Sequence, residues 1–242
     1  FGAADTIKLA PEAWPKNKVS PTGIAVNKSN TSLYTVTKEY SALYVVDPQK
    51  RVVIKRVPLP AEAYSCVLSR DEKLLYISIW GDEKVTVFNT STQKIVKNIK
   101  TGSHPNELLL NKKGTYLYVA NANDNSVSVI NTATGKIAET LSTSLYPTHL
   151  TGSTSNGLAL SPDEKTLYIA NADNNCLAVF DVSAPGASKS MGFIPVGWYP
   201  TNVKTLGDKI IVSNGKGFTS MPNPDGPQPL KKTDNSGYQI GS

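Results

Sequence analysis

One line of sequence occurs almost unchanged at two places in this chain. Residues 116–137 read YLYVANANDNSVSVINTATGKI, and residues 167–183 read LYIANADNNCLAVFDVS. Each copy contains two runs rich in Val, Ile, Leu and Tyr, separated by a short break rich in Asn and Asp, a pattern that is typical of a tight β-hairpin. Two such similar hairpins predict a protein that is built from repeated units.

The repeat extends over most of the chain. Corresponding strand-like runs recur at intervals of 42, 42, 50 and 43 residues. Their marker positions are Tyr34, Tyr76, Tyr118, Tyr168 and Ile211. Within one unit, as at 106–141, four short β-type runs alternate with breaks rich in Gly, Asn and Asp, which predicts a four-stranded antiparallel meander. The runs are apolar on both alternating faces, so neighbouring units must cover both faces of each sheet.

We therefore predict an all-β fold, a β-propeller of four-stranded antiparallel blades. No segment shows the 3.6-residue apolar period of an amphipathic helix, which excludes helical solenoids, and a radial stack of blades leaves few exposed sheet edges. The predicted blades are four complete ones at 19–60, 61–102, 103–147 and 148–197 and a partial fifth at 198–217. Residues 1–18 form an N-terminal segment, and 218–242 form a Pro/Gly-rich loop.

These repeats resemble a known bacterial family. LYVANANDNSVSVINTATGKI (117–137) and LALSPDEKTLYIANADNN (158–175) are similar to the YVTN-type repeat of exported, surface-layer-like propellers. VGWYPTNV (196–203), VSNGKGFTSMPNPDGP (212–227) and GYQIGS (237–242) resemble a YncE-like subgroup, in which the propeller precedes a phosphoesterase domain of the alkaline phosphatase superfamily. The resemblance implies an exported protein, in the periplasm or at the surface of a bacterium.

The resemblance also bears on the number of blades. Family members close with about seven blades, which implies that the intact protein continues past Ser242. The alternative is a smaller ring, in which the segment DTIKLA (5–10) supplies a closing strand to the fifth blade. Because GYQIGS stops where chains of the family continue, we favour the longer protein.

Composition sets further bounds on the protein class. The chain of 242 residues is 39% hydrophobic and 18% charged, as in ordinary globular proteins, and it contains no apolar run long enough to span a membrane. It opens on Phe1 rather than Met, which fits a removed export signal or a trimmed chain. The net charge of +6 is scattered, which disfavours nucleic acid as a partner. Cys66 and Cys176 lie in apolar runs and are predicted to be small buried hydrophobes.

Propeller topology indicates where a ligand would bind. The loops that enter the first strand of each blade gather on one face with the loops between the second and third strands. The candidate ligand-binding residues in these loops are Tyr64, Trp80, His104, Asn106, Asn121, Asp124, His149, Asn171, Asp173, Trp198 and Tyr199. Asn121 and Asn171 have a structural alternative, since an asparagine that ends a strand commonly bonds to nearby backbone.

The 50-residue interval carries eight residues more than the 42-residue norm. We expect them in the stretch 142–157, before the first strand of the fourth blade, where the added length faces the ligand. A surface extension without a role is the alternative. The two histidines, His104 and His149, lack carboxylate or cysteine partners at ligand spacing, so we predict no metal site and no cofactor.

We expect no catalysis by this chain. Glu107 is the only carboxylate near the starts of the channel-lining strands, whereas a propeller glycosidase needs a pair. No Gly-x-Ser-x-Gly elbow, Cys–His arrangement or phosphate loop is present. The prediction is a non-catalytic recognition or scaffolding module that binds a small molecule, a glycan or a protein. The alternative is the recognition domain of a larger metal-dependent phosphoesterase, whose catalytic domain follows Ser242.

Overall fold

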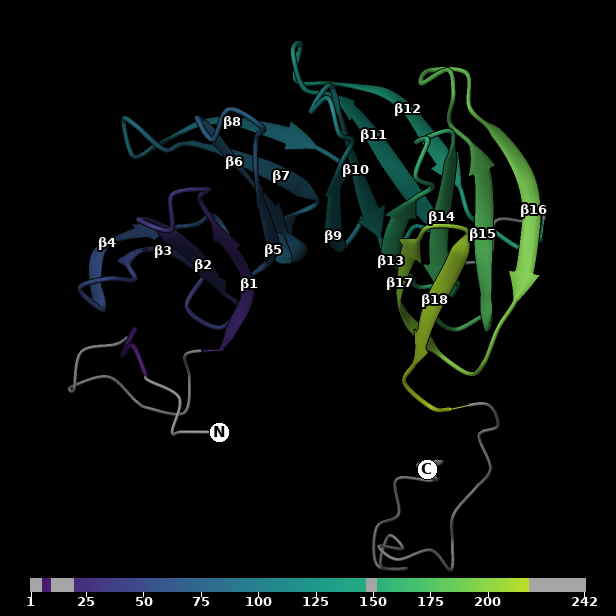
Figure 1. Cartoon of the computed structure of the whole chain (residues 1–242), viewed down its shortest axis with the longest axis horizontal. Coiled ribbons are helices and arrows are strands. Elements are labelled where there is room, and N and C mark those ends of the chain that lie inside the picture. The colour runs from purple at the N-terminus through teal and green to yellow at the C-terminus, as the bar shows by residue number, and fades with distance from the viewer. Residues whose placement is uncertain (1–5, 10–19, 147–151, 218–242) are drawn as a thin grey trace, which may run out of the picture.

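The computed structural model describes residues 6–9, 20–146 and 152–217. Within these ranges the chain forms four four-stranded antiparallel sheets and one two-stranded sheet. Strands that follow one another in sequence are neighbours in each sheet, so every sheet is a meander. The sheets stand side by side in an arc (Figure 1), which confirms the prediction of an all-β propeller.

Each sheet is one blade, and blades 1 to 5 follow the order of the chain. Blade 1 contains β1 (Pro21–Val26), β2 (Leu33–Thr37), β3 (Ala42–Asp47) and β4 (Val52–Pro58). Blade 2 contains β5 (Ala63–Leu68), β6 (Leu74–Ile79), the short 3-10 turn η1 (Trp80–Asp82), β7 (Lys84–Asn89) and β8 (Lys94–Lys100). Blade 3 contains β9 (Pro105–Leu110), β10 (Tyr116–Asn121), β11 (Ser126–Asn131) and β12 (Lys136–Ser142).

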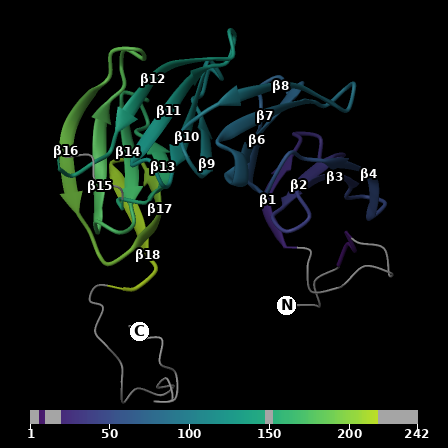
Figure 2. The ribbon, with the colours of Figure 1, turned by 180° about the vertical axis from the view of Figure 1, so that it is seen from behind.

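The remaining strands form blade 4 and a two-stranded blade 5. Blade 4 contains β13 (Ser155–Leu160), β14 (Thr166–Asn171), β15 (Cys176–Asp181) and β16 (Lys189–Pro195). Blade 5 contains β17 (Pro200–Leu206) and β18 (Lys209–Asn214). The view from behind shows the same order of blades from the other side (Figure 2). Residues 1–5 and 10–18 of the expected N-terminal segment and the expected loop 218–242 lie outside the described residues.

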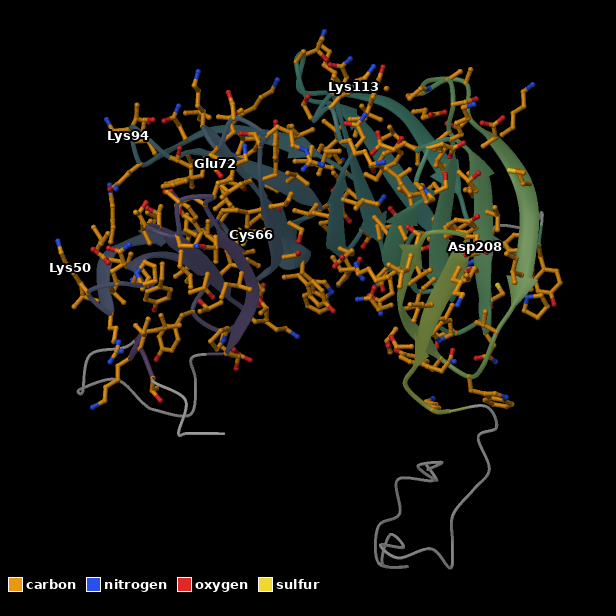
Figure 3. All side chains as sticks on the ribbon, in the orientation of Figure 1. Lys50, Cys66, Glu72, Lys94, Lys113 and Asp208 are labelled. Carbon is orange, nitrogen blue, oxygen red and sulfur yellow. The ribbon has the colours of Figure 1, made fainter. Side chains whose placement is uncertain are left out.

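The first strand of each blade lies on the concave side of the arc. These innermost strands are β1, β5, β9, β13 and β17, and we call the surface that they form the inner wall (Figure 1). The last strands of the complete blades form the outer rim, where Lys50, in the turn before β4, and Lys94, at the start of β8, project (Figure 3). A channel-facing side chain must therefore come from an innermost strand or from a loop beside it.

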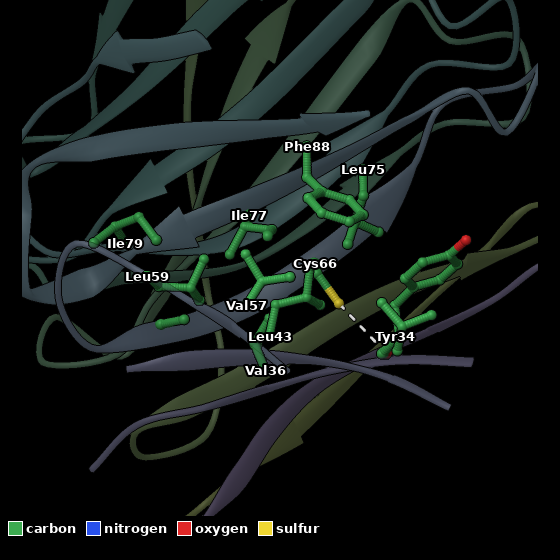
Figure 4. Packing of buried hydrophobic residues seen from close by; sticks show 12 residues of the cluster. Tyr34, Val36, Leu43, Val57, Leu59, Cys66, Leu75, Ile77, Ile79 and Phe88 are labelled. Atoms are coloured by element: carbon green, nitrogen blue, oxygen red, sulfur yellow. Dashed lines mark hydrogen bonds between the residues drawn. The ribbon is translucent and has the colours of Figure 1, made fainter. Parts of the chain in front are cut away.

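Apolar side chains fill the space between neighbouring blades. Between blades 1 and 2, Val36 and Leu43 pack against Ile77 and Phe88, all buried (Figure 4). Ile77 faces blade 1, whereas the adjacent Tyr76 belongs to the cluster between blades 2 and 3. Because alternate residues of a strand point to opposite faces, an inner blade needs apolar residues at nearly every position. This packing explains the doubly apolar strands of the sequence.

Both cysteines belong to this interior. Cys66 and Cys176 are free and buried, as their apolar runs predicted. The Cys66 thiol lies 3.9 Å from the carbonyl oxygen of Tyr34 (Figure 4), and burial raises its pKa to about 12. A thiol that stays protonated at neutral pH is not a nucleophile, so Cys66 serves packing.

Two glycines allow innermost strands to approach closely. A Cβ on Gly23 of β1 would lie 2.6 Å from the Cα of Ser65, and one on Gly157 of β13 would lie 2.6 Å from the Cα of Asn202. The third residue of β9, the corresponding position in blade 3, is Glu107. Blade 3 therefore carries a long charged side chain at a position where blades 1 and 4 require none.

The two ends of the arc expose apolar side chains. Ile24 of β1 is 63% exposed, and Leu206 of β17 is 67% exposed. On blade 1, Ile7 and Leu9 pack against the face of β3 that carries Tyr44, although residues 6–9 form no strand. The end faces are thus less completely covered than the faces between blades.

Candidate functional site

The two sets of loops that the sequence placed on one face are hydrogen-bonded to each other. In four of the blades, a backbone N–H just after the second strand donates to the carbonyl of the residue before the innermost strand, at 3.1 Å or less. These pairs are Lys38 with Ser20, Ala122 with His104, Ala172 with Thr154 and Gly215 with Tyr199. We call this surface the entry face. The innermost strands run from it along the inner wall.

The eight extra residues lie where the sequence predicted them. The connection from β12 to β13 covers 143–154, twelve residues, whereas the connections before β5, β9 and β17 each contain four. Gly152 and Ser153 of this connection donate their backbone N–H groups to Oδ1 of Asn125, at 3.1 and 2.7 Å. The predicted site residue His149 lies outside the described residues.

The three predicted ligand-binding asparagines are buried within the blades. Asn121 and Asn171 have no exposed surface, and Asn106 is almost fully buried. Nδ2 of Asn121 donates to the hydroxyls of Ser126 and Ser128, both at 2.9 Å, and Nδ2 of Asn171 donates to the Thr143 carbonyl at 2.8 Å. In this arrangement the three amides are not accessible to a ligand, and the structural alternative describes Asn121 and Asn171.

The predicted aspartates tie loops together on the entry face. Oδ2 of Asp124 accepts a hydrogen bond from the backbone N–H of Ser103 at 2.6 Å, and Oδ2 of Asp173 accepts one from the Thr154 hydroxyl. In both blades the carboxylate joins the loop after the second strand to the entry loop. Each of these two predicted site residues thus has a structural partner within its own blade.

The predicted aromatic residues remain at the surface. Trp80 contacts the Lys38 ammonium, 4.4 Å from its ring centroid, and the His104 ring, edge to face at 4.4 Å between centroids. Tyr199 carries the Lys216 ammonium 4.9 Å from its ring centroid. Trp198 is exposed on the same face. A chain of ring and cation contacts therefore crosses blades 1 to 3, separate from the aromatic pair at blade 5.

The charged groups that meet on the inner wall come from blades 3 and 5. Glu107 of β9 and Lys204 of β17 form an ion pair, with 3.7 Å between Oε1 and Nζ. The Glu107 side chain is 28% exposed and that of Lys204 is 60% exposed, so both reach the channel. Sequence reasoning recorded Glu107 only as an unpaired acid and missed Lys204. Asn202 is the third residue of β17, as Glu107 is of β9. The sequence signal that could have identified Lys204 is therefore a lysine two residues after this position.

The Glu107 carboxyl is held in a poorly solvated place. Burial raises its pKa, and the Lys204 ammonium offsets only part of this effect. Burial also raises the pKa of Tyr64 on β5, with smaller contributions from the charges of Glu107 and Tyr199. These couplings place Tyr64, a predicted site residue, in the same electrostatic environment as the ion pair.

A β-bulge aims the Glu107 side chain. Pro105 pairs with Asn121 and Leu108 pairs with Val119, so two residues of β9, Asn106 and Glu107, lie opposite a single residue of β10. Each of the other innermost strands shows a register shift near its start as well. Bulges bend a strand and redirect a side chain, and they are common beside active sites.

The described residues offer no preformed metal site. In the ranges 6–9, 20–146 and 152–217, no group of three or more His, Cys, Asp or Glu side chains could hold a metal ion. No helix in these ranges is long and apolar enough to cross a membrane.

The family emerges from comparison with known sequences. The model of the family described as lactonase, 7-bladed β-propeller, matches residues 61–143 and 97–217. The chain belongs to this lactonase family. The finer YVTN-type and YncE-like resemblance is not confirmed and stays a prediction. No curated protein matches the chain.

Solved structures resemble this lactonase-family chain in fold. A provisionally named 6-phosphogluconolactonase of Bacteroides fragilis has a TM-score of 0.68 at 19% identity, covering 79% of this chain and 62% of that one. Its counterpart from Bacteroides uniformis has a TM-score of 0.62 at 15% identity, covering 84% and 60%. Hydrazine synthase of Kuenenia stuttgartiensis has a TM-score of 0.52 at 17% identity, covering 80% and 83%. The chain thus spans about three fifths of the two Bacteroides proteins.

Membership in the lactonase family corrects the prediction that this chain is not an enzyme. That prediction was wrong because it tested the inner wall against a glycosidase, whose mechanism needs two carboxylates across the scissile bond. Opening a lactone needs a base to activate water but no second carboxylate, so the lack of a carboxylate pair did not exclude an enzyme. The alternative with a phosphoesterase domain beyond Ser242 stays a prediction.

Proposed function

We propose that this protein hydrolyses lactones and that the reaction takes place at the inner wall, between Glu107 and Lys204. The observation that carries the proposal is their ion pair, which joins blades 3 and 5 across the concave side of the arc. A carboxyl whose pKa is raised by burial is a better base than an exposed one, since its proton affinity lies closer to neutral pH. The lactonase family and the names of the two Bacteroides neighbours support this chemistry.

The proposed reaction assigns one role to each side chain. The Glu107 carboxylate takes a proton from water while the water oxygen forms a bond to the lactone carbonyl carbon. The Lys204 ammonium stabilises the negative charge that develops on the carbonyl oxygen. The bond between carbonyl carbon and ring oxygen then breaks, and the Tyr64 hydroxyl donates a proton to the departing ring oxygen. Glu107 returns its proton to Tyr64 through solvent, and the product is a hydroxy acid.

The test is a pH-stat assay of proton release on a panel of five- and six-membered lactones, with and without a phosphate group. We expect hydrolysis above the spontaneous rate for at least one of them, and a loss of kcat of about 100-fold or more in Glu107→Gln, the usual range for removing a general base. Lys204→Met lowers kcat because the oxyanion loses its cation.

The matched control is Glu164→Gln. Glu164 lies in the turn that precedes β14, and it accepts a hydrogen bond from the backbone N–H of Lys112 at 2.6 Å, away from the inner wall. This variant keeps its activity. Full activity of Glu107→Gln, or no hydrolysis of any lactone by the unmodified protein, contradicts the proposal.

A further inference from the structure

We infer that Asn106 is a positioning residue, which holds Glu107 in place on the inner wall. The inference rests on the proposed function, in which Glu107 is the base. It reassigns Asn106 from a ligand-facing residue to one that acts through its neighbour. Its side chain contacts protein groups only and is 4% exposed.

The Asn106 amide makes hydrogen bonds in two directions. Its Oδ1 accepts the backbone N–H of Glu107 at 2.6 Å, so it fixes the backbone of the bulge from which the carboxylate projects. Its Nδ2 donates to the Ser155 carbonyl at 3.3 Å and to Oδ1 of Asn156 at 3.2 Å, both on β13. The carbonyl of Asn106 accepts the Ser78 hydroxyl at 2.7 Å. One buried side chain thus connects the bulge to the next blade.

Comparison with blade 1 distinguishes two roles of Asn106: a hydrogen bond that joins neighbouring blades, which we call the clasp, and the positioning of Glu107. The second residue of each innermost strand occupies the position of Asn106, and in β1 it is Thr22. The Thr22 hydroxyl donates to the Ala63 carbonyl of β5 at 3.0 Å, which is the same clasp between blades that Asn106 makes to Ser155. The hydrogen bonds of the Thr22 hydroxyl go to the carbonyls of Val36 and Ala63, whereas the Asn106 amide also uses its oxygen to accept the N–H of the next residue. Blade 3 has that additional acceptor at the residue before Glu107.

Without Asn106, the Glu107 carboxylate loses its defined approach to Lys204. The Glu107 N–H would lose its acceptor, and a bulge without that bond is free to relax. The charged group that acts on Glu107 is Lys204 from β17, and the charge of Glu107 acts in turn on Tyr64 from β5. Relaxation moves the carboxylate toward solvent in the channel, where burial no longer opposes its charge.

The test is an NMR titration of the Glu107 carboxyl carbon, assigned with the Glu107→Gln variant. In Asn106→Ala we expect the midpoint to fall by about 0.5 pH unit or more, toward the ordinary value of an exposed glutamate. The control is Thr22→Val, which removes the equivalent clasp in blade 1 and leaves the midpoint unchanged. In the lactone assay, Asn106→Ala lowers kcat more than it alters KM.

The outcomes separate positioning from mere stabilisation. An unchanged Glu107 midpoint in a folded but less stable Asn106→Ala protein overturns the inference. If Asn106→Ala does not fold, Asn156→Ala removes one partner of the clasp, and it should shift the midpoint in the same direction by a smaller amount; no shift overturns the inference. A shifted midpoint in a protein that hydrolyses no lactone supports the positioning role and refutes the proposed function.

Discussion

At the scale of single residues, Glu107 carries a conflict between stability and chemistry. Burial raises its pKa in the folded protein above that of the unfolded chain, despite Lys204. Between these two pKa values the folded state binds more protons, so the free energy of unfolding falls as pH rises through the interval. Above the folded pKa, the cost of keeping this carboxylate poorly solvated is fully present. In the proposed function, the charge that costs stability at neutral pH is the charge that activates water.

The corresponding prediction is that Glu107→Gln stabilises the protein at neutral pH while it lowers kcat of the proposed lactone hydrolysis. We expect a Tm about 2 °C higher than that of the unmodified protein at about pH 7, and a smaller gain at about pH 4, where the carboxyl is largely protonated in both states. Lys204→Met shows the opposite sign at pH 7, because it removes the charge that favours the carboxylate. Thermal unfolding at both pH values decides this, and equal Tm gains at both values would contradict it.

At the scale of elements, one position in the outer strands links each of blades 1, 2 and 3 to the next blade. Nζ of Lys55 in β4 donates to the Gln93 carbonyl at 3.2 Å, and Nζ of Lys97 in β8 donates to the Thr134 carbonyl at 2.9 Å. In β12 the same position is Glu139, which accepts the backbone N–H groups of the loop between β15 and β16. The charge of the side chain at this position matches the groups on the next blade. Lysine lies where that blade offers carbonyl acceptors, and glutamate lies where it offers N–H donors.

This link predicts unequal effects of substitution in blades 2 and 3. Glu139 accepts hydrogen bonds from Gly186 N at 2.8 Å, Ser188 N at 3.0 Å and the Ser188 hydroxyl at 2.6 Å. Glu139→Lys should cost about 2 kcal/mol, because it loses these charge-assisted bonds and places a cation against donors. Lys97→Met, which loses a single exposed bond, should cost about 0.5 kcal/mol. Urea unfolding measures both losses of unfolding free energy. Equal losses would contradict the prediction that the Glu139 link contributes more than the Lys97 link.

At the scale of the whole molecule, the arc ends in faces that lack the neighbour an inner blade has. Leu206, at 67% exposure, and Ile211, at 52%, lie on blade 5, and Ile24 lies on blade 1. The same kinds of residue are buried wherever two blades meet. Exposed apolar faces and unpaired strand edges favour association.

We therefore expect the isolated 242-residue chain to self-associate through its blade ends. The double variant Leu206→Lys with Ile211→Lys should lower the sedimentation coefficient at a given protein concentration. Its control is Val96→Lys with Met191→Lys, which alters equally exposed apolar residues on the outer strands β8 and β16 and leaves association unchanged. If both double variants reduce association alike, general surface hydrophobicity rather than the blade ends is responsible.

Several features of this protein could be predicted from local sequence. The alternation of apolar residues, the Asn/Asp-rich hairpin breaks and the 42-residue interval led to four-stranded blades, to the placement of the longer entry loop before β13 and to buried Cys66 and Cys176. These properties depend on the period of a strand and on the length of its connections, and both are local. The entry face was found for the same reason, because it follows from the chain path of a meander.

The site on the inner wall was decided by the tertiary structure alone. Glu107 and Lys204 belong to different blades, and they meet because the arc curves β9 toward β17 and because Gly157 leaves the intervening strand without a side chain. Asn106 was expected to bind a ligand, and for Asn121 and Asn171 the sequence left a ligand role and a structural role open; packing turned all three amides inward, since an asparagine can bond within a blade as readily as to a ligand. The sequence by itself determined that this protein is a propeller of repeated blades. Only the packing of those blades brought one carboxylate and one ammonium together, because contacts between blades depend on long-range curvature that no local pattern encodes.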